Sequence, residues 1–324
     1  MKLIVIAGPT AVGKTGLAIE LAKKLGGEII SADSMQVYKY MDIGTAKPTP
    51  QEMGGVRHYL VDELEPWEDY SVAVFVRKAK GYLEHMHARG KTAIIVGGTG
   101  FYINALVNDN NFMYTDSNND IREEFYTISR HNESSYLHKL LMEADPVSAQ
   151  RIHPNNVKRI VRALEFHRLT GGPISEHNDQ ERERSSPYDV SFFILNMPRD
   201  QLYRRIERRV DKMIKDGLVC EVQKLLDMGV SPDSVSMRGL GYKEIVPYIQ
   251  GLMPLREAVD LLKRNTRRFA KRQLTWFRHQ TVKSGRGDSK KPVAKTWINV
   301  DESANMCIIN DIINIIDAPI KYFI

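Results

Sequence analysis

Short apolar runs alternate with amphipathic stretches through the first hundred residues of the chain. The runs are rich in Ile and Val and bounded by polar residues, which is typical of buried strands, and the stretches between them carry apolar side chains at helical spacing. The predicted strands are residues 3–7, 28–32, 58–62 and 92–96. The predicted helices are residues 17–25 and 72–87. Strands that alternate with helices in this way predict a parallel sheet covered by helices.

The pattern changes in the middle of the chain. Residues 108–119 are rich in Asn and Asp and are typical of a linker, whereas residues 121–169 have helical periodicity throughout. Residues 171–187 are polar and predict a loose segment, and residues 190–195 again have the pattern of a strand. This order indicates one α/β core that is interrupted by a helical insertion.

The last third predicts two long basic helices, at residues 199–228 and 255–279, and a closing strand and helix within residues 296–316. The polar residues 283–291 between them predict a surface loop. The fold class that we expect is therefore α/β, with a parallel sheet flanked by helices and an inserted all-helical domain. The expected core is residues 1–110 and 188–324, and the expected insertion is residues 111–187.

Composition adds a mild positive charge to this picture. The 324 residues include 46 Lys and Arg against 40 Asp and Glu, with a pI near 9.1, which suits a polyanionic partner but equally an indifferent basic surface. The only cysteines, Cys220 and Cys307, form no CxxC pair, so the sequence offers no thiolate zinc site. No apolar run approaches the roughly 20 residues that span a membrane, and we expect a cytoplasmic protein.

A phosphate-binding loop follows the first predicted strand. The segment GPTAVGKT matches the pattern GxxxxGK[ST] and opens a predicted helix, which is the context that the motif requires. Its backbone amides and the helix dipole attract one anion, Lys14 adds a positive charge, and Thr15 is positioned to ligate Mg²⁺. The residues predicted to bind a diphosphate or nucleotide are Gly8, Pro9, Thr10, Ala11, Val12, Gly13, Lys14 and Thr15.

The segment after the fourth predicted strand argues against a nucleoside triphosphatase. Such enzymes usually end a later core strand with an acidic residue that holds Mg²⁺. Here the strand continues into Gly97, Gly98, Thr99 and Gly100, with no Asp or Glu. The Thr99 hydroxyl instead suits contact with a diphosphate oxygen, although the same glycines would also serve a tight turn.

Asp33 lies just beyond the second predicted strand, and ligands bind at the carboxyl edge of a parallel sheet. We expect Asp33 to face the phosphate loop and to accept a proton from a nucleophile; a helix cap and a magnesium-bound aspartate are the alternatives. Gln36 follows closely, and its amide is suited to reading the edge of an adenine.

Six blocks follow one another in the chain: GPTAVGKT, SADSMQVYKYMDIGTAKP, VGGTGFY, RIHPNN with KRIVRALE, RGLGYKE, and TRRFAKRQLTWFR. In these blocks, and in their order, the chain resembles the bacterial tRNA dimethylallyltransferases, also called tRNA isopentenyltransferases or the IPP transferase family. The resemblance runs from residue 1 to about residue 280. The resemblance implies a P-loop kinase-like core with an inserted helical domain. It also implies a Mg²⁺-dependent transfer of dimethylallyl from dimethylallyl diphosphate to N6 of the adenosine 3′ of the tRNA anticodon, position 37.

The family's site residues map onto this chain position by position. The implied catalytic residues are Asp33, Thr99, Lys14 and Arg208, the last chosen from the arginine run at residues 204–209. The implied tRNA-binding residues are Asp33, Ser34, Met35, Gln36, Thr99, Arg122, Lys158, Arg159, Ile160, Val161, Arg162, Met237, Arg238, Gly239, Leu240, Gly241 and Tyr242. The implied partners are dimethylallyl diphosphate and the tRNA anticodon stem-loop, with one chain, a monomer, supplying every site.

Two departures and two rival hypotheses remain. Residues 108–116 are Asn-rich where the family has a Gly–Leu run with prolines, and no Cys/His cluster follows residue 280, as expected of the short bacterial form. The basic cluster Arg264, Arg267, Arg268, Lys271 and Arg272 predicts RNA contact, or else a solvated helical face. The rivals are an ATP-dependent small-molecule or nucleotide kinase and a non-catalytic RNA-binding protein switched by nucleotide.

Overall fold

The computed structural model describes residues 1–112, 119–131, 134–284, 291–300 and 305–317. The chain divides into two compact units. Unit 1 combines residues 1–108 with residues 186–324, and unit 2 is residues 109–185. The described helices of both units are too short or too polar to cross a lipid bilayer.

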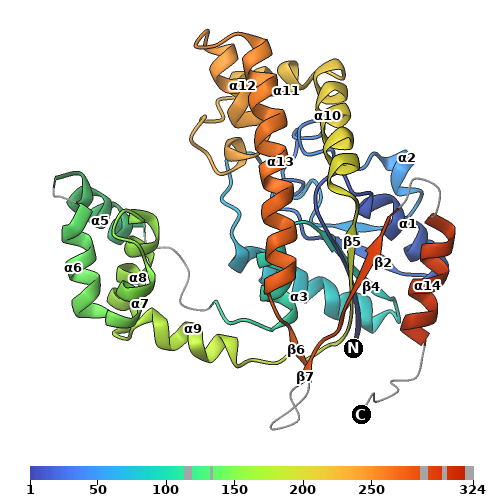
Figure 1. Ribbon diagram of the computed structural model, residues 1–324, viewed down its shortest axis with the longest axis horizontal. Coiled ribbons are helices and arrows are strands. Elements are labelled where there is room, and N and C mark those ends of the chain that lie inside the picture. Colours follow the sequence, from blue (N-terminus) through green and yellow to red (C-terminus); the bar gives the residue numbers. More distant parts are fainter. Residues whose placement is uncertain (113–118, 132–133, 285–290, 301–304, 318–324) are drawn as a thin grey trace. The chain divides into compact units, whose positions relative to one another are not determined.

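The centre of unit 1 is a six-stranded sheet in the order β3-β2-β4-β1-β5-β8, and every neighbouring pair is parallel (Figure 1). Its strands are β1 (Lys2–Ala7), β2 (Glu28–Ser31), β3 (His58–Tyr59), β4 (Ala93–Gly97), β5 (Asp189–Asn196) and β8 (Lys295–Asn299). The fold class predicted from the sequence is confirmed. All strands are parallel, so the segments that follow β1, β2 and β4 emerge at the same edge.

Unit 1 contains helices that cover the apolar strands of the sheet and helices that pack on other helices. They are α1 (Lys14–Leu25), α2 (Pro50–Met53), α3 (Val72–Ala88), α4 (Gly100–Val107), α10 (Arg199–Lys215), α11 (Leu218–Asp227), α12 (Tyr242–Ile249), α13 (Leu255–His279) and α14 (Asn305–Asp317). On one face, Ile4 and Ile6 of β1 share a buried core with Leu21 of α1 and Ile312 of α14. Burying an Ile of this kind stabilises the fold by about 2 kcal/mol.

Three elements differ from their predictions. The single helix expected at residues 199–228 is two helices, because Gly217 has φ of 105°, a left-handed conformation that ends one helix and begins another. The expected third strand is shortened to two residues in β3. The polar segment after residue 171 contains helix α9 (Ile174–Arg182) rather than a loose chain.

The loop expected at residues 283–291 begins and ends in a short antiparallel pair, β6 (Lys283–Ser284) with β7 (Lys291–Pro292). Residues 285–290 of this loop and residues 113–118 of the expected linker lie outside the described residues.

The described part of unit 2 is all-helical. It comprises α5 (Asn119–His131), α6 (Ser134–Ala144), α7 (Pro146–Arg151), α8 (Val157–Thr170) and α9. Its core joins Phe125 of α5, Leu137 and Leu141 of α6, and Ile160 and Leu164 of α8. These residues recur at helical spacing, so each helix turns one apolar stripe inward.

Candidate active site

The phosphate loop connects β1 to α1. Gly8 has φ of 148°, and a Cβ on it would lie 2.7 Å from the Leu195 carbonyl oxygen, so only glycine fits beside β5. Gly13 is left-handed as well, and α1 begins at Lys14 without a side-chain cap. The first amides of α1 are thereby kept for an anion, at the positive end of the helix dipole.

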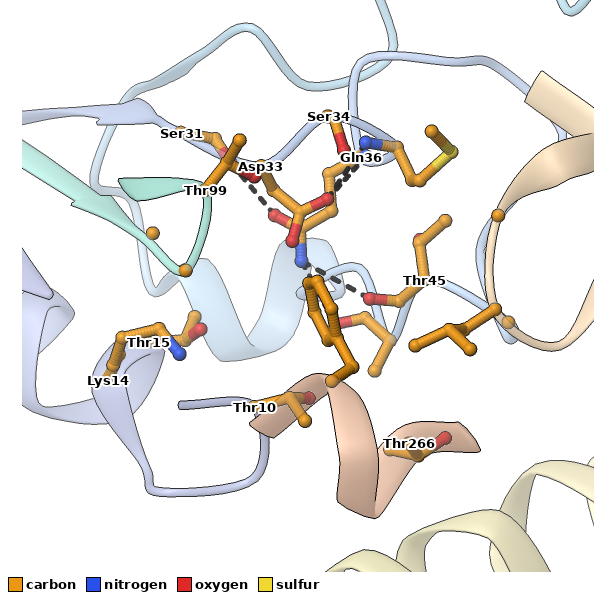
Figure 2. Close-up of a pocket in the computed structure, with 18 of the residues that line it drawn as sticks. Thr10, Lys14, Thr15, Ser31, Asp33, Ser34, Gln36, Thr45, Thr99 and Thr266 are labelled. Carbon is orange, nitrogen blue, oxygen red and sulfur yellow. Dashed lines mark hydrogen bonds between the residues drawn. The ribbon is translucent and has the colours of Figure 1, made fainter. Parts of the chain in front are cut away.

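A cavity of about 340 Å³ lies at the carboxyl edge of the sheet, in unit 1. Three loops supply its polar lining: Thr10, Lys14 and Thr15 come from the phosphate loop, Asp33 from the segment after β2, and Thr99 from the segment after β4 (Figure 2). Helices α10 and α13 supply the other side, which includes Arg209, Met213, Phe269 and Gln273. The structure thus brings the predicted phosphate loop, Asp33 and Thr99 into one site.

Lys14 and Arg209 are the cations of this cavity whose pKa is shifted by their surroundings. Lys14 donates a hydrogen bond from Nζ to the Pro9 carbonyl at 2.7 Å, and burial together with the charge of Arg209 lowers its pKa to about 7, against an opposing effect of Asp33. Burial also lowers the pKa of Arg209, again opposed by Asp33. Two partly buried cations, one of which lowers the proton affinity of the other, form a site that favours an anion.

The structure places Arg209, and not the expected Arg208, at the cavity. Arg208 is exposed and does not line the cavity, whereas Arg209 does and donates to the Thr45 carbonyl at 3.5 Å. The reason is the rotation of α10, whose buried stripe includes Ile206 and Val210. Residue 209 lies beside that stripe and residue 208 lies on the solvent side.

Asp33 is fixed by a turn rather than by a helix cap. Its Oδ1 accepts from the backbone amides of Met35 at 2.8 Å and Gln36 at 3.4 Å, and no helix follows directly. The Asp33 side chain is partly buried. Its negative charge acts on Tyr102: burial of the Tyr102 hydroxyl, together with the charge of Asp33, raises the pKa of Tyr102 to about 12. The turn holds Asp33 in one orientation at the cavity wall.

Gln36 lines the cavity, but its amide bonds to the protein itself. Its Oε1 accepts from the Ser31 hydroxyl at 3.0 Å, and its Nε2 donates to the carbonyls of Thr45 and Ala46, each at 3.4 Å (Figure 2). In this conformation the predicted base reading by the Gln36 amide is not supported, because both ends of the amide are used. Gln36 instead ties the segment after β2 to the loop before α2.

Thr99 is placed by a short backbone contact. Its amide donates to the Ala32 carbonyl at 3.2 Å, and Gly97 packs so closely on Ala32 that a Cβ at position 97 would collide with it. Thr99 is the N-cap residue of α4, but its hydroxyl makes no capping hydrogen bond. The Thr99 side chain lines the cavity instead. The glycines therefore serve the tight turn and also bring Thr99 beside the phosphate loop.

The predicted tRNA segment at residues 237–242 divides into buried and accessible members. Met237 and Tyr242 are fully buried, which rules out RNA contact by their side chains in this conformation. Tyr242 instead donates to Glu221 at 2.6 Å, and Glu221 accepts from the amides of Asp42, Ile43 and Gly44. Arg238, Gly239 and Leu240 line the cavity, whereas Gly241 does not.

The predicted tRNA residues of unit 2 divide in the same way. Ile160 and Val161 belong to its core, so their side chains do not face RNA, whereas Lys158 and Arg159 are exposed. Arg122 and Arg162 both pair with the fully buried Glu165, at 2.9 Å and 2.8 Å. Sequence reasoning missed Glu165, Glu221 and Gln273, whereas Arg209 lies within the predicted arginine run at residues 204–209.

The comparisons with known proteins agree with one another. The IPP transferase family profile matches residues 36–280 of the chain. A tRNA dimethylallyltransferase of Lachnoclostridium phytofermentans is 54% identical over 278 residues, which cover 86% of this chain and 89% of that protein. Another, of Acetivibrio thermocellus, is 47% identical and covers 93% of this chain and 92% of its own length.

Solved structures give the same result. The crystal structure of the full-length tRNA isopentenylpyrophosphate transferase of Bacillus halodurans is similar with a TM-score of 0.69 and 44% identity, over 97% of this chain and 96% of that one. A eukaryotic dimethylallyltransferase acting on tRNA is similar with a TM-score of 0.76 and 32% identity, over 86% of this chain and 70% of that one.

Proposed function

Because the chain belongs to the IPP transferase family and transfers a dimethylallyl group to adenosine 37 of tRNA, we propose that both substrates meet in the cavity at the carboxyl edge of its sheet. The observation that carries this proposal is the convergence of Lys14, Arg209, Thr99 and Asp33 on one cavity. The donor is dimethylallyl diphosphate and the acceptor is the anticodon stem-loop.

The phosphate loop, Lys14 and Arg209 hold the diphosphate of the donor. The exocyclic amine of adenine is a weak nucleophile, so the main catalytic task is to stabilise the negative charge that develops on the departing diphosphate. The first amides of α1, the two cations and the Thr99 hydroxyl supply this stabilisation. They are already in place before reaction, so little reorganisation is required.

Asp33 orients the amine of the target adenosine and accepts its proton as the new carbon–nitrogen bond forms. The turn bonds to Oδ1 fix the carboxylate, and its second oxygen is the natural acceptor. The adenosine reaches Asp33 only after it leaves the anticodon-loop stack, at a cost of a few kcal/mol that base contacts offset.

The apolar side chains of α10 and α13 receive the dimethylallyl group. Val210, Met213, Leu262 and Phe269 line the cavity beside the polar loops. An apolar wall also excludes water from an allylic carbon that becomes electron-poor as the bond to diphosphate breaks.

In this site Mg²⁺ would be held more by oxygens of the substrate diphosphate than by protein side chains. The described residues form no cluster of three or more Asp, Glu, His or Cys that would hold a metal alone. Thr15 lines the cavity at the start of α1, and Mg²⁺ prefers few protein ligands together with phosphate oxygens and water. Thr15 would therefore hold the ion, whose chemistry is to neutralise charge on the diphosphate.

The acceptor is bound by the basic surfaces of both units. The accessible basic members of the predicted tRNA set are Arg238 in unit 1 and Arg122, Lys158, Arg159 and Arg162 in unit 2. We propose a monomer, because one chain lines the whole cavity, and a cytoplasmic location, because tRNA is found there.

The test is to incubate the protein with Mg²⁺, labelled dimethylallyl diphosphate and an unmodified anticodon stem-loop. We expect prenylated adenosine after digestion, and none from an RNA with guanosine at position 37. Phosphoryl transfer from ATP to a small molecule without prenylated adenosine would contradict the proposal and support the kinase alternative.

A further inference from the structure

Gln273 joins two loops of the cavity that are far apart in sequence. Its Oε1 accepts from the Thr10 amide of the phosphate loop at 2.9 Å, and its Nε2 donates to the Gly98 carbonyl after β4 at 3.0 Å. The side chain is buried, with 6% of its surface exposed. Both partners are backbone groups, so the bridge acts on the course of the two loops.

A primary amide is well matched to this position. The bridge needs one acceptor and one donor on adjacent atoms, and an uncharged amide supplies both at once. Position 98 accommodates it only as glycine, because a Cβ there would collide with the Gln273 nitrogen. The short loop after β4 is thus shaped around Gln273.

The bridge also fixes what the phosphate loop offers to a ligand. The Thr10 amide donates to Gln273 and is therefore not available to an anion. Thr10 contributes its side chain to the cavity, and the backbone amides that can bind an anion are those of the residues that follow Thr10. Gly98 is adjacent to Thr99 in the chain, and Gln273 follows Arg272 on α13; both neighbours line the cavity. A shift of Gln273 therefore moves both walls of the diphosphate site.

We infer that Gln273 is a positioning residue for prenyl transfer, which holds the phosphate loop and the turn at Gly98 at the spacing that the donor diphosphate requires. This inference rests on the proposed function for the identity of the donor. Gln273 touches neither reacting atom; it acts through Thr10 and Gly98. Misplacement of reacting groups by about 1 Å lowers rates by roughly a hundredfold.

The first variant is Gln273→Met, which keeps the length of the side chain and removes both hydrogen bonds. We expect KM for dimethylallyl diphosphate and Kd for inorganic diphosphate to rise about tenfold or more, because two loops lose their common anchor. Affinity for the RNA alone stays within about twofold, since the exposed basic residues are retained. The control is Gln223→Met, because Gln223 is exposed on α11 and bonds only to Asp227 of its own helix.

The second variant is Gln273→Glu, which gives a pH signature. An ionised carboxylate accepts from Thr10 but cannot donate to Gly98, whereas a protonated carboxyl does both. Burial raises the pKa of such a carboxyl, so activity relative to wild type should recover about fivefold or more between about pH 8 and pH 6. The activity of Gln273→Met relative to wild type should not change over this pH range, because methionine does not titrate.

Unchanged donor KM and diphosphate Kd in Gln273→Met, with only a lower melting temperature, would overturn the inference. If Gln273→Met does not fold, the pH ratio of Gln273→Glu decides, and a flat ratio overturns it. A wild type that binds diphosphate but forms no prenylated adenosine contradicts the proposed function alone, because the diphosphate Kd values still test the bridge.

Discussion

Lys14 and Arg209 define the chemistry of the cavity at the scale of single residues. Each is a partly buried cation, and the charge of Arg209 adds to burial in lowering the pKa of Lys14 to about 7. The negative charge of Asp33 opposes part of this lowering of the Lys14 pKa. In the proposed reaction, Asp33 faces the amine of the target adenosine. A bound diphosphate would supply the missing negative charge, so the proton occupancy of Lys14 should depend on the donor.

Binding of the diphosphate should therefore take up a proton. Above about pH 7 the free Lys14 amine is largely neutral, and a bound anion raises its pKa so that it becomes protonated. Affinity then falls as pH rises through this value. Calorimetry at about pH 8 in two buffers of different ionisation enthalpy should show uptake of close to one proton, absent in Lys14→Met. Identical heats in the two buffers would contradict this assignment.

Arg209 and the neighbouring Arg208 offer a matched pair of substitutions. Arg209→Ala should lower kcat/KM for the donor about a hundredfold, because a partly buried cation next to the leaving group is lost. Arg208→Ala should change it less than about threefold, since that side chain is exposed. Steady-state kinetics with both variants checks the proposed role of Arg209, and the reverse order of effects would favour Arg208 instead.

At the scale of elements, the clearest determinant in unit 2 is Asp145. It caps α7 and accepts from the amides and hydroxyls of both Ser148 and Ser175, so it joins α7 to α9. Burial raises its pKa, but these four bonds outweigh burial and lower it. The stabilisation is therefore present above the usual pKa of an aspartate and is lost as pH falls below it.

Asp145→Asn should destabilise unit 2 locally. The amide keeps the size of the side chain but accepts fewer bonds, so the free energy of opening of α7 and α9 should fall by about 1–3 kcal/mol. Hydrogen exchange measured amide by amide gives this value. Asp179→Asn is the control, because Asp179 is exposed and its ion pairs contribute little. Equal effects of the two substitutions would refute the role of Asp145 as a cap.

The elements also show what the sequence could predict. The strands at the phosphate loop, Asp33 and Thr99 were predictable, because each site residue follows its strand directly and parallel strands end at one edge. The position of Arg209 at the cavity was not predictable, because which arginine of the run at residues 204–209 faces the cavity depends on the rotation of α10 against the sheet. Gln273 was not either, since its partner Thr10 lies 263 residues away. Helix α9 was missed because buried bonds to Asp145 hold a segment that is polar by composition.

At the scale of the whole molecule, we propose that unit 1 alone holds the donor, whereas residues of both units hold the acceptor. The donor cavity belongs to unit 1, whereas Arg122 and Arg162 belong to unit 2, where Glu165 holds both. A buried carboxylate that pairs with two arginines restricts their orientation, and oriented guanidinium groups suit RNA phosphates.

Substitution in unit 2 should therefore separate the two substrates. Arg122→Ala should raise KM for tRNA about fivefold or more and leave KM for dimethylallyl diphosphate within about twofold. Arg130→Ala is the control, because it removes an exposed positive charge from the same helix outside the predicted set. A rise in donor KM, or an equal effect of the control, would contradict the assignment.

The most direct test of the account is single-turnover transfer by wild type and Asp33→Ala, with donor and anticodon stem-loop both at saturating concentrations. We predict that Asp33→Ala binds both substrates within about threefold of wild type and forms prenylated adenosine at least about a hundredfold more slowly, because only orientation of the amine and removal of its proton are lost. Transfer at the wild-type rate by Asp33→Ala would contradict the central claim that Asp33 and the phosphate loop act on one reaction in one cavity.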